Sequence, residues 1–278
     1  METVFVDNDS GYQVPIHWTP GSEGPVIVIL GALSTPAPFY QRLTTEIGAR
    51  GWPVAVVEQR GLGASALRPS HDVDWSFADV LHTDLPAALG WVREQAPDRP
   101  LVLLGHSLGG HYAAMAAGLY AEHVDGVVLA ACGTPWVGAF EDPVRSMIQH
   151  LGAVIPTLCA ERGYYPGEEA GFGGDEACGV MADWRHLAQT NRFRLGEDEE
   201  TVAGLIGQYD GPVLAIGMSE DDFAPPAAVA ASVDRFPPRP TERVLTTEEI
   251  EMVADHFGWA RKPSAVVKII ADWWAEAT

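Results

Sequence analysis

The sequence predicts an α/β protein: a mostly parallel, twisted sheet with helices on both faces and an inserted cap. Three observations predict it. Short, continuous apolar runs, such as 25–30 and 101–104, alternate with helix-like segments, as in sheets whose strands are buried on both faces. Residues 136–207 interrupt this alternation. Directly after the apolar run 101–104, a glycine-rich turn leads into a helical segment, which is a strand–turn–helix order.

The first part of the chain is expected to open with a β-hairpin. Turn residues 8–11 (NDSG) separate the strand-like runs 4–6 and 14–18. Further on, Gly51 is expected to end a helix as its C-cap, and Pro86 to kink a longer one. The expected elements after the hairpin are a strand at 25–30, a helix at 39–50, a strand at 54–57 and a helix at 74–95.

The next strand, turn and helix contain the strongest functional signal. Residues 105–110 read GHSLGG, which matches G-x-S-x-G, between the strand at 101–104 and a helix at 111–121. In that context the motif is a nucleophile elbow, a tight turn that holds a serine hydroxyl above the sheet at a helix N-terminus. Ser107 is therefore the predicted nucleophile. A strand at 126–131 follows.

Residues 136–207 are expected to form a cap over the site. They contain a glycine- and proline-rich centre at 163–167 and lack the regular rhythm of the flanking segments. We therefore predict a core domain made of 1–135 and 208–278, with 136–207 inserted as the cap. The expected elements after the cap are a strand at 212–217, a helix near 226–236, a strand at 242–245 and a helix at 264–276. The aromatic residues of the predicted cap are Trp136, Phe140, Tyr164, Tyr165, Phe172, Trp184 and Phe193.

Composition excludes several classes of function. The formal net charge of −21 disfavours binding to nucleic acid and to anionic membranes, because both are negatively charged. Three cysteines without a C-x-x-C pair do not indicate a disulfide framework. We find no metal-binding or dinucleotide-binding motif, so no metal and no cofactor are expected. The N-terminal residues lack a signal-peptide pattern and no apolar run is long enough to span a membrane, so a cytoplasmic location is expected. Whether the chain forms a homo-oligomer is left open.

A nucleophilic serine needs a base, and the base needs an acid that orients it. His256 lies after the last predicted strand and before the last helix, in the order nucleophile, acid, base that such sites use. The acid is expected just after the strand at 212–217, where carboxylates cluster. Asp221 is our choice, Asp222 is the alternative, and Glu220 is less favoured.

Two backbone N–H groups should stabilise the oxyanion that forms on the substrate. The N–H of Leu108, directly after Ser107, is one. The turn after the strand at 25–30 should supply the other, from Ala32 or alternatively from Leu33. His106 and His111 flank the elbow and are expected to support the turn or the pocket rather than act as the base. The predicted substrate-binding residues are Leu33, His106, Trp136, Tyr164 and Trp184, although the cap aromatics could equally form a core of the cap.

Taken together, these residues resemble the α/β-hydrolase superfamily and, within it, the serine aminopeptidase S33-like ("hydrolase 4") group of bacterial hydrolases. The likeness spans almost the whole chain and implies the α/β-hydrolase fold and acyl hydrolysis. It departs from many relatives at Leu30-Gly31, where they carry His-Gly. The likeness rests on 30–32 (LGA), 39–40 (FY), 59–65 (QRGLGAS), 105–110 (GHSLGG), 165–167 (YPG), 221–222 (DD) with 225–226 (PP), and 256–258 (HFG).

The function we expect is a serine hydrolase that uses Ser107, His256 and Asp221 to cleave a small, largely apolar carboxylic ester, with thioesters and amides left open. The expected partner is a small-molecule acyl substrate. Two alternatives remain. One is a tailoring enzyme for natural products that uses the same site for cyclisation or acyl transfer. The other is a ligand-binding protein without catalysis, which an intact set of three residues disfavours.

Overall fold

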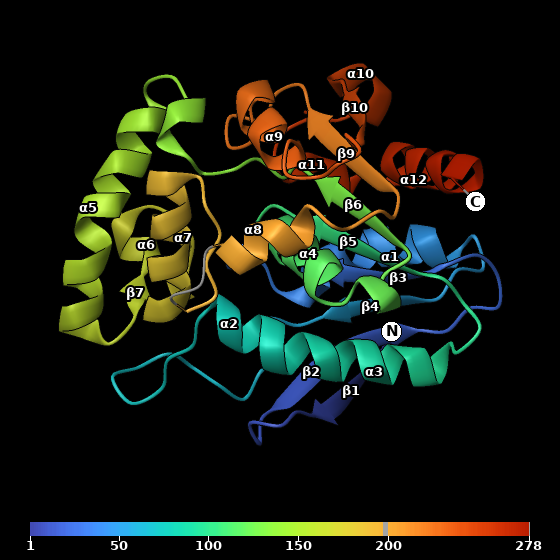
Figure 1. Cartoon of the computed structure of the whole chain (residues 1–278), viewed down its shortest axis with the longest axis horizontal. Helices are drawn as coiled ribbons and strands as arrows, with labels where there is room; N and C mark the ends of the chain where they lie inside the picture. Colours follow the sequence, from blue (N-terminus) through green and yellow to red (C-terminus); the bar gives the residue numbers. More distant parts are fainter. Residues whose placement is uncertain (197–199, 278) are drawn as a thin grey trace.

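The computed structural model describes residues 1–196 and 200–277, and its centre is an eight-stranded sheet. The strand order is β1-β2-β4-β3-β5-β6-β9-β10. β2 pairs antiparallel with β1 and β4, and all other neighbours are parallel, which confirms the predicted mostly parallel sheet (Figure 1). The strands are β1 (Glu2–Asp7), β2 (Gln13–Thr19), β3 (Val26–Leu30), β4 (Val54–Val57), β5 (Leu101–His106), β6 (Gly126–Ala130), β9 (Val213–Met218) and β10 (Thr241–Leu245).

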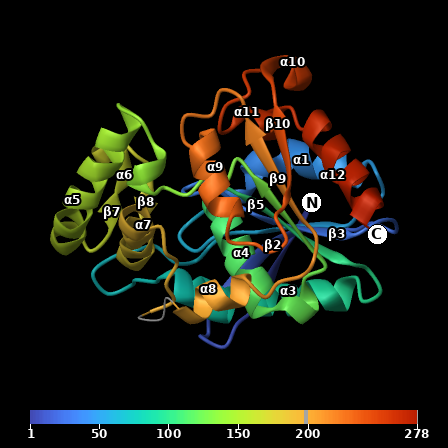
Figure 2. The ribbon, with the colours of Figure 1, turned by 45° about the horizontal axis from the view of Figure 1, so that its top comes forward.

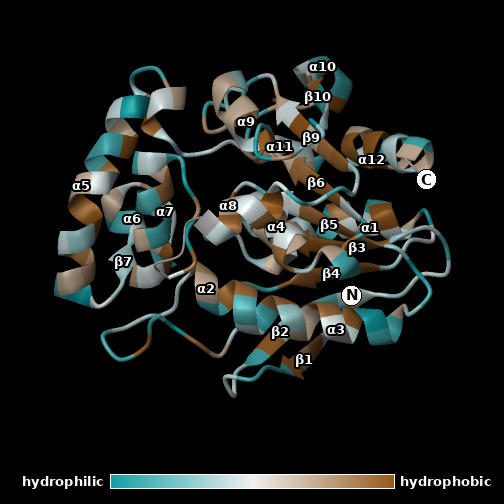
Figure 3. Cartoon of the chain, in the orientation of Figure 1, coloured by the Kyte–Doolittle hydropathy of each residue, from teal (hydrophilic) through white to brown (hydrophobic). Residues whose placement is uncertain are grey.

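Helices cover both faces of the sheet, and each face has its own hydrophobic core. One core joins strand residues such as Ile29 and Val56 to α1 and α12. The other joins Val28 and Leu103 to α3 and α4. Figure 3 shows the central strands, such as β3, β5 and β6, largely as hydrophobic, as expected for strands buried on both faces. These helices and the shorter ones around them are η1 (Ala37–Tyr40), α1 (Gln41–Gly48), α3 (Leu85–Gln95), α4 (Leu108–Leu119), η3 (Ala121–His123), α9 (Pro226–Val233), α10 (Thr247–Ile250), α11 (Gly258–Arg261) and α12 (Ser264–Ala277).

The helix predicted over 74–95 is divided by one wider turn. Ordinary α-helix forms in α2 (Phe77–Asp79) and in α3, and the residues between them, η2 (Val80–Asp84), form a π-helical turn. Pro86 accounts for the change, because it has no N–H for the carbonyl four residues earlier and its ring crowds that carbonyl. The kink predicted at this proline is therefore a change of helix type, and the wide turn ends at the buried Asp84.

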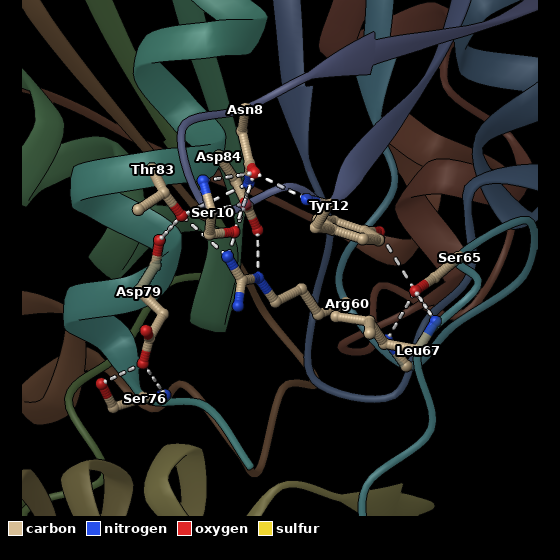
Figure 4. Close-up of polar contacts among 11 residues, drawn as sticks. Asn8, Ser10, Tyr12, Arg60, Ser65, Leu67, Ser76, Asp79, Thr83 and Asp84 are labelled. Carbon is tan, nitrogen blue, oxygen red and sulfur yellow. Dashed lines mark hydrogen bonds and ion pairs between the residues drawn. The ribbon is translucent and has the colours of Figure 1, made fainter. Parts of the chain in front are cut away.

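Asp84 is the centre of a buried polar network that joins three parts of the chain (Figure 4). Arg60, which follows β4, donates from Nε and Nη2 to the two carboxylate oxygens of Asp84 at 2.6 and 2.8 Å. Asn8 of the hairpin turn donates to Asp84 Oδ1 at 2.6 Å. Close by, the Tyr12 hydroxyl donates to Ser65 Oγ at 3.1 Å. The R-G-x-G-x-S turn at 60–65 is thus fixed to the hairpin and to the π-helical turn.

Replacing Asp84 with alanine is expected to lower the free energy of unfolding by about 3–5 kcal/mol. The Arg60 and Asp84 side chains are only 7% and 6% exposed, so the substitution leaves a buried guanidinium without its counter-charge. Urea unfolding of the two proteins measures the difference. The matched control is Asp272→Ala, whose partner Lys268 lies on the surface of α12, and which should cost less than about 1 kcal/mol. Equal losses in the two variants would contradict this account.

The chain between β6 and β9 forms a separate lobe beside the sheet (Figures 1 and 2). Helices α5 and α7 pack against each other, and the short hairpin β7–β8 lies with them. We call residues 137–190 the α5–α7 lobe. The predicted cap, 136–207, also includes α8, but that helix packs against α4 of the sheet layer. The elements of this segment are η4 (Val137–Ala139), α5 (Val144–Arg162), β7 (Tyr165–Pro166), α6 (Gly167–Ala170), β8 (Asp175–Glu176), α7 (Cys178–Thr190) and α8 (Glu200–Ile206).

Candidate active site

Ser107 occupies a sharp turn between β5 and α4. Its backbone has φ 53° and ψ −116°, in the positive-φ region that non-glycine residues rarely adopt. The flanking glycines are required by close packing. A Cβ at Gly105 would lie 2.3 Å from the carbonyl oxygen of Gly109, and a Cβ at Gly109 would lie 2.0 Å from that of Leu30. α4 begins at Leu108 rather than at the predicted residue 111, so the turn delivers Ser107 directly to a helix N-terminus.

Ser107 opens onto a cavity of about 210 Å³ between the sheet layer and the α5–α7 lobe. Among the described lining residues, none carries a carboxylate, ammonium or guanidinium group, and the polar side chains are those of Ser107, His111 and His256. The remaining surface is mostly aromatic and aliphatic, which suits an uncharged, largely apolar ligand. The lining residues are Ala32, Leu33, Ser107, Leu108, His111, Gly133, Pro135, Phe140, Met147, Ile148, Gly171, Phe172, Gly173, Trp184, Phe223, His256 and Phe257.

His256 shares this cavity with Ser107 and is bound from behind by Asp221. His256 Nδ1 lies 3.0 and 2.9 Å from the two carboxylate oxygens of Asp221. Asp221 follows β9, its side chain is fully buried, and its Oδ1 also accepts the backbone N–H groups of Phe223 and Ala224 at 2.9 and 3.0 Å. Asp222 is exposed. The structure therefore brings Asp221, and not the alternative Asp222, to the histidine.

The backbone donors differ from the prediction at one position. Leu108 is the first residue of α4, so its N–H has no acceptor within the helix. The N–H of Ala32, by contrast, donates to the Tyr40 hydroxyl at 2.8 Å, so it is not free to bind an oxyanion. This contact favours Leu33, the alternative donor, over Ala32. The alternative, Leu33, lines the cavity, and no acceptor for its N–H is found among the described residues.

Tyr40 also starts a chain of hydrogen bonds that passes beneath the serine. Having accepted the N–H of Ala32, its hydroxyl donates to His106 Nδ1 at 2.9 Å, which leaves Nε2–H of His106 to donate to the carbonyl of His256 at 2.8 Å. Complete burial lowers the pKa of His106 far below its usual value, and the neighbouring His256 acts in the same direction. A neutral His106 thus connects the Ala32 turn to the loop that carries His256.

Two of the five predicted substrate-binding residues line the cavity, and three do not. Leu33 and Trp184 line the cavity as predicted, but His106, Trp136 and Tyr164 do not. His106 is 0% exposed and serves the hydrogen-bond chain, and Trp136 packs against the core. His111, expected to support the turn or the pocket, does line the cavity.

The aromatic surface contributed by Phe172, Phe223 and Phe257 was not assigned from the sequence, because nothing in the local pattern shows which aromatic rings face the cavity. The neutral state of His111 is also a property of the folded site. Its pKa is lowered to about 3, first by burial and then by the charge of Arg235. His111 therefore adds a polar group to the cavity without adding a charge.

The described residues contain no group of three or more His, Cys, Asp or Glu side chains that could hold a metal ion. Within the same residues, no helix has both the length and the apolar character needed to cross a membrane.

Comparison with known proteins gives the same fold. The sequence model of the family "Serine aminopeptidase, S33" matches residues 22–170. Protein ABHD12B of Homo sapiens is 29% identical over 140 residues, which are 48% of this chain and 37% of that protein. Protein phosphatase methylesterase 1 of Bos taurus is 30% identical over 115 residues, 40% of this chain and 28% of that protein. The chain therefore spans well under half the length of either relative.

A thermophilic esterase from Thermogutta terrifontis superposes with a TM-score of 0.68 at 17% identity, covering 100% of this chain and 99% of the other. This superposition confirms the predicted α/β-hydrolase fold.

Proposed function

The chain belongs to the serine aminopeptidase S33 family of α/β-hydrolases, and on that premise we propose that it hydrolyses carboxylic esters through an acyl-enzyme on Ser107. One observation carries the proposal. A serine in a strained elbow at the start of α4 shares its cavity with His256, whose far nitrogen is bound by the buried Asp221. This is the arrangement of nucleophile, base and orienting acid that acyl transfer requires.

The assignment of protons follows from these contacts. Asp221 only accepts hydrogen bonds when ionised, so it favours the tautomer of His256 with the proton on Nδ1. Nε2 is then free to take the proton of Ser107 as its oxygen attacks the acyl carbon. The negative charge that forms on the acyl oxygen is bound by the N–H groups of Leu108 and Leu33, where the N-terminus of α4 also favours it.

The second half of the reaction uses the same groups in reverse order. Protonated His256 gives its Nε2 proton to the departing alcohol, which leaves an ester between the substrate acyl group and Ser107. Water then loses a proton to His256 and attacks this ester, the two N–H donors again bind the oxyanion, and the acid is released as Ser107 regains its proton. Esters should react more readily than amides, because an alkoxide is a far better leaving group than an amide anion.

The cavity supports a small, uncharged substrate. Its wall is apolar apart from Ser107, His111 and His256, and burying a charged group there without a partner would be costly. Neutral aliphatic or aromatic acyl esters should therefore react in preference to esters that carry a second carboxylate.

Labelling with a fluorophosphonate tests the proposal directly, because this reagent phosphonylates only an activated serine. We expect the intact protein to gain the mass of one adduct, and the Ser107→Ala variant to gain none. The labelled protein should also lose its activity toward p-nitrophenyl esters. Absence of an adduct on the native protein, or an adduct that persists in Ser107→Ala, would overturn the proposal.

A further inference from the structure

Ser34 joins the α5–α7 lobe to the loop that carries the Leu33 N–H. Ser34, the next residue, donates its hydroxyl to Glu176 Oε1 at 2.6 Å, and the same hydroxyl accepts the N–H of Gly174 at 2.7 Å. Glu176 belongs to β8, and Gly174 comes just before that strand. Residues 140 positions apart thus meet at the edge of the cavity. The sequence prediction assigned no role to either Ser34 or Glu176.

The other contacts of this loop come from the sheet layer and from the loop itself. Gln59 Nε2 donates to the carbonyl oxygens of Gly31 and Ala32 at 2.7 and 2.9 Å. Tyr40 holds the N–H of Ala32. The Ala32 carbonyl, which shares a peptide with the Leu33 N–H, also accepts the N–H of Thr35 at 3.1 Å, and the Thr35 hydroxyl donates to the Leu33 carbonyl at 3.1 Å. The contact with the lobe is made at Ser34, between these two residues. The Leu33 peptide is therefore held by the sheet layer, by Thr35 and, through Ser34, by Glu176.

Ser34 needs this support because of its backbone. Its φ is 56°, in the left-handed region that favours glycine, and a serine keeps such a conformation only where its surroundings impose it. Packing contributes as well: a Cβ at Gly173 would lie 3.0 Å from Ser34 Oγ and 3.4 Å from Leu33 Cδ2. The lobe therefore approaches both Leu33 and Ser34 closely.

Glu176 is poorly explained as a stabilising residue. It is 3% exposed, the charge acting on it is another carboxylate, that of Asp175, and no cation pairs with it among the residues that the structure describes. Burial raises its pKa to about 7, although the hydrogen bonds from Ser34 act in the opposite direction. A carboxyl group buried without a counter-charge disfavours folding, so its role is better sought in the contact it makes.

We propose that Glu176 is a positioning residue for acyl transfer: it holds Ser34, and thereby holds the Leu33 N–H in place to bind the oxyanion. This inference rests on the function proposed above. It makes the oxyanion site depend on the docked lobe as well as on the sheet layer. The residue touches neither substrate nor the reacting atoms, so its effect is exerted through Ser34.

Steady-state kinetics of a p-nitrophenyl ester test the role with matched variants. Glu176→Ala is expected to lower kcat by about 10- to 100-fold, less than the loss of a complete oxyanion donor, with KM changed less than about two-fold, because the donor acts on the transition state. Glu176→Gln keeps an oxygen that can accept from Ser34, so it should recover most of the lost kcat. Asp175→Ala, which alters the exposed neighbour in β8, should leave kcat unchanged.

The kinetics of Ser34→Ala and of the double variant test the same contact independently. Ser34→Ala removes the hydroxyl that Glu176 and Gly174 share and keeps the backbone contact of residue 34 with Glu176. It changes a half-buried residue, so it serves if Glu176→Ala does not fold. The losses in the double variant Ser34→Ala/Glu176→Ala should equal, rather than multiply, those of the single variants.

Unchanged kcat in a folded Glu176→Ala or Ser34→Ala, a Glu176→Gln variant as slow as Glu176→Ala, or losses that multiply in the double variant would each overturn the proposal. The native protein separates this failure from that of the proposed function. If it neither labels with fluorophosphonate nor cleaves esters, the function itself is wrong. If it does both and the variants match it, only the role of Glu176 is wrong.

Discussion

Ser107→Ala is expected to abolish ester hydrolysis, with a fall in kcat of about 10⁴- to 10⁶-fold. Alanine has no oxygen to form the acyl-enzyme, and His256 and Asp221 then have no nucleophile to activate. The oxyanion donors would remain, so a small residual rate above the reaction in water is expected. Progress curves with a p-nitrophenyl ester at high protein concentration measure the loss.

The fold should tolerate this change, because Ser107 forms no side-chain hydrogen bond among the described residues and alanine keeps the Cβ that the turn already accommodates. Circular dichroism and urea unfolding should therefore match the native protein. Ser219→Ala, an exposed serine just beyond β9, is the control and should retain full activity. Turnover retained in Ser107→Ala would exclude the covalent mechanism.

Asp221→Asn is expected to lower kcat by about 10⁴-fold, whereas Asp222→Asn should change it by less than about three-fold. The two residues are adjacent, and the substitutions are chemically identical. Only Asp221 contacts His256, through Nδ1 at 2.9 Å. An asparagine there would offer its NH₂ to Nδ1 and shift the ring proton to Nε2, so that His256 could no longer accept the proton of Ser107.

The dependence on pH gives this comparison a second readout. An Asp221→Asn site should recover part of its rate at high pH, where Ser107 loses its proton without help from the histidine. The Asp222→Asn profile should superimpose on that of the native protein. The reverse pattern, with Asp222→Asn as the slow variant, would move the orienting acid to Asp222 and contradict the structure.

The sequence alone predicts the sheet and the elbow because both are local. Strands such as β5 are continuous apolar runs, and the glycines around Ser107 are needed where backbone meets backbone. His256 could be placed by its position relative to the last strand and helix. Asp221 and Asp222 could be ranked but not separated, because the difference between them is which carboxylate turns inward.

What could not be predicted depends on contacts between distant segments. The sequence of the loop favours Ala32 over Leu33 as the oxyanion donor. It does not show that the hydroxyl of Tyr40, eight residues later, accepts the Ala32 N–H. Within the predicted cap, Trp184 lines the cavity and Trp136 does not, although the sequence shows both simply as aromatic residues. The pairing of Ser34 with Glu176 spans 142 positions and has no signal in either local pattern.

The cavity wall has two origins. The sheet layer supplies Ser107 and His256, and the α5–α7 lobe supplies apolar surface such as Phe172 and Trp184. The hydrogen-bond chain from Tyr40 through His106 lies in the sheet layer outside the wall. Mutations in the lobe can therefore change which substrates fit the cavity while Ser107 and His256 stay the same. Glu176 restricts this freedom, since a lobe exchanged by recombination must still bring an acceptor to Ser34. A chimaera that lacks one should bind its new substrate and turn it over slowly.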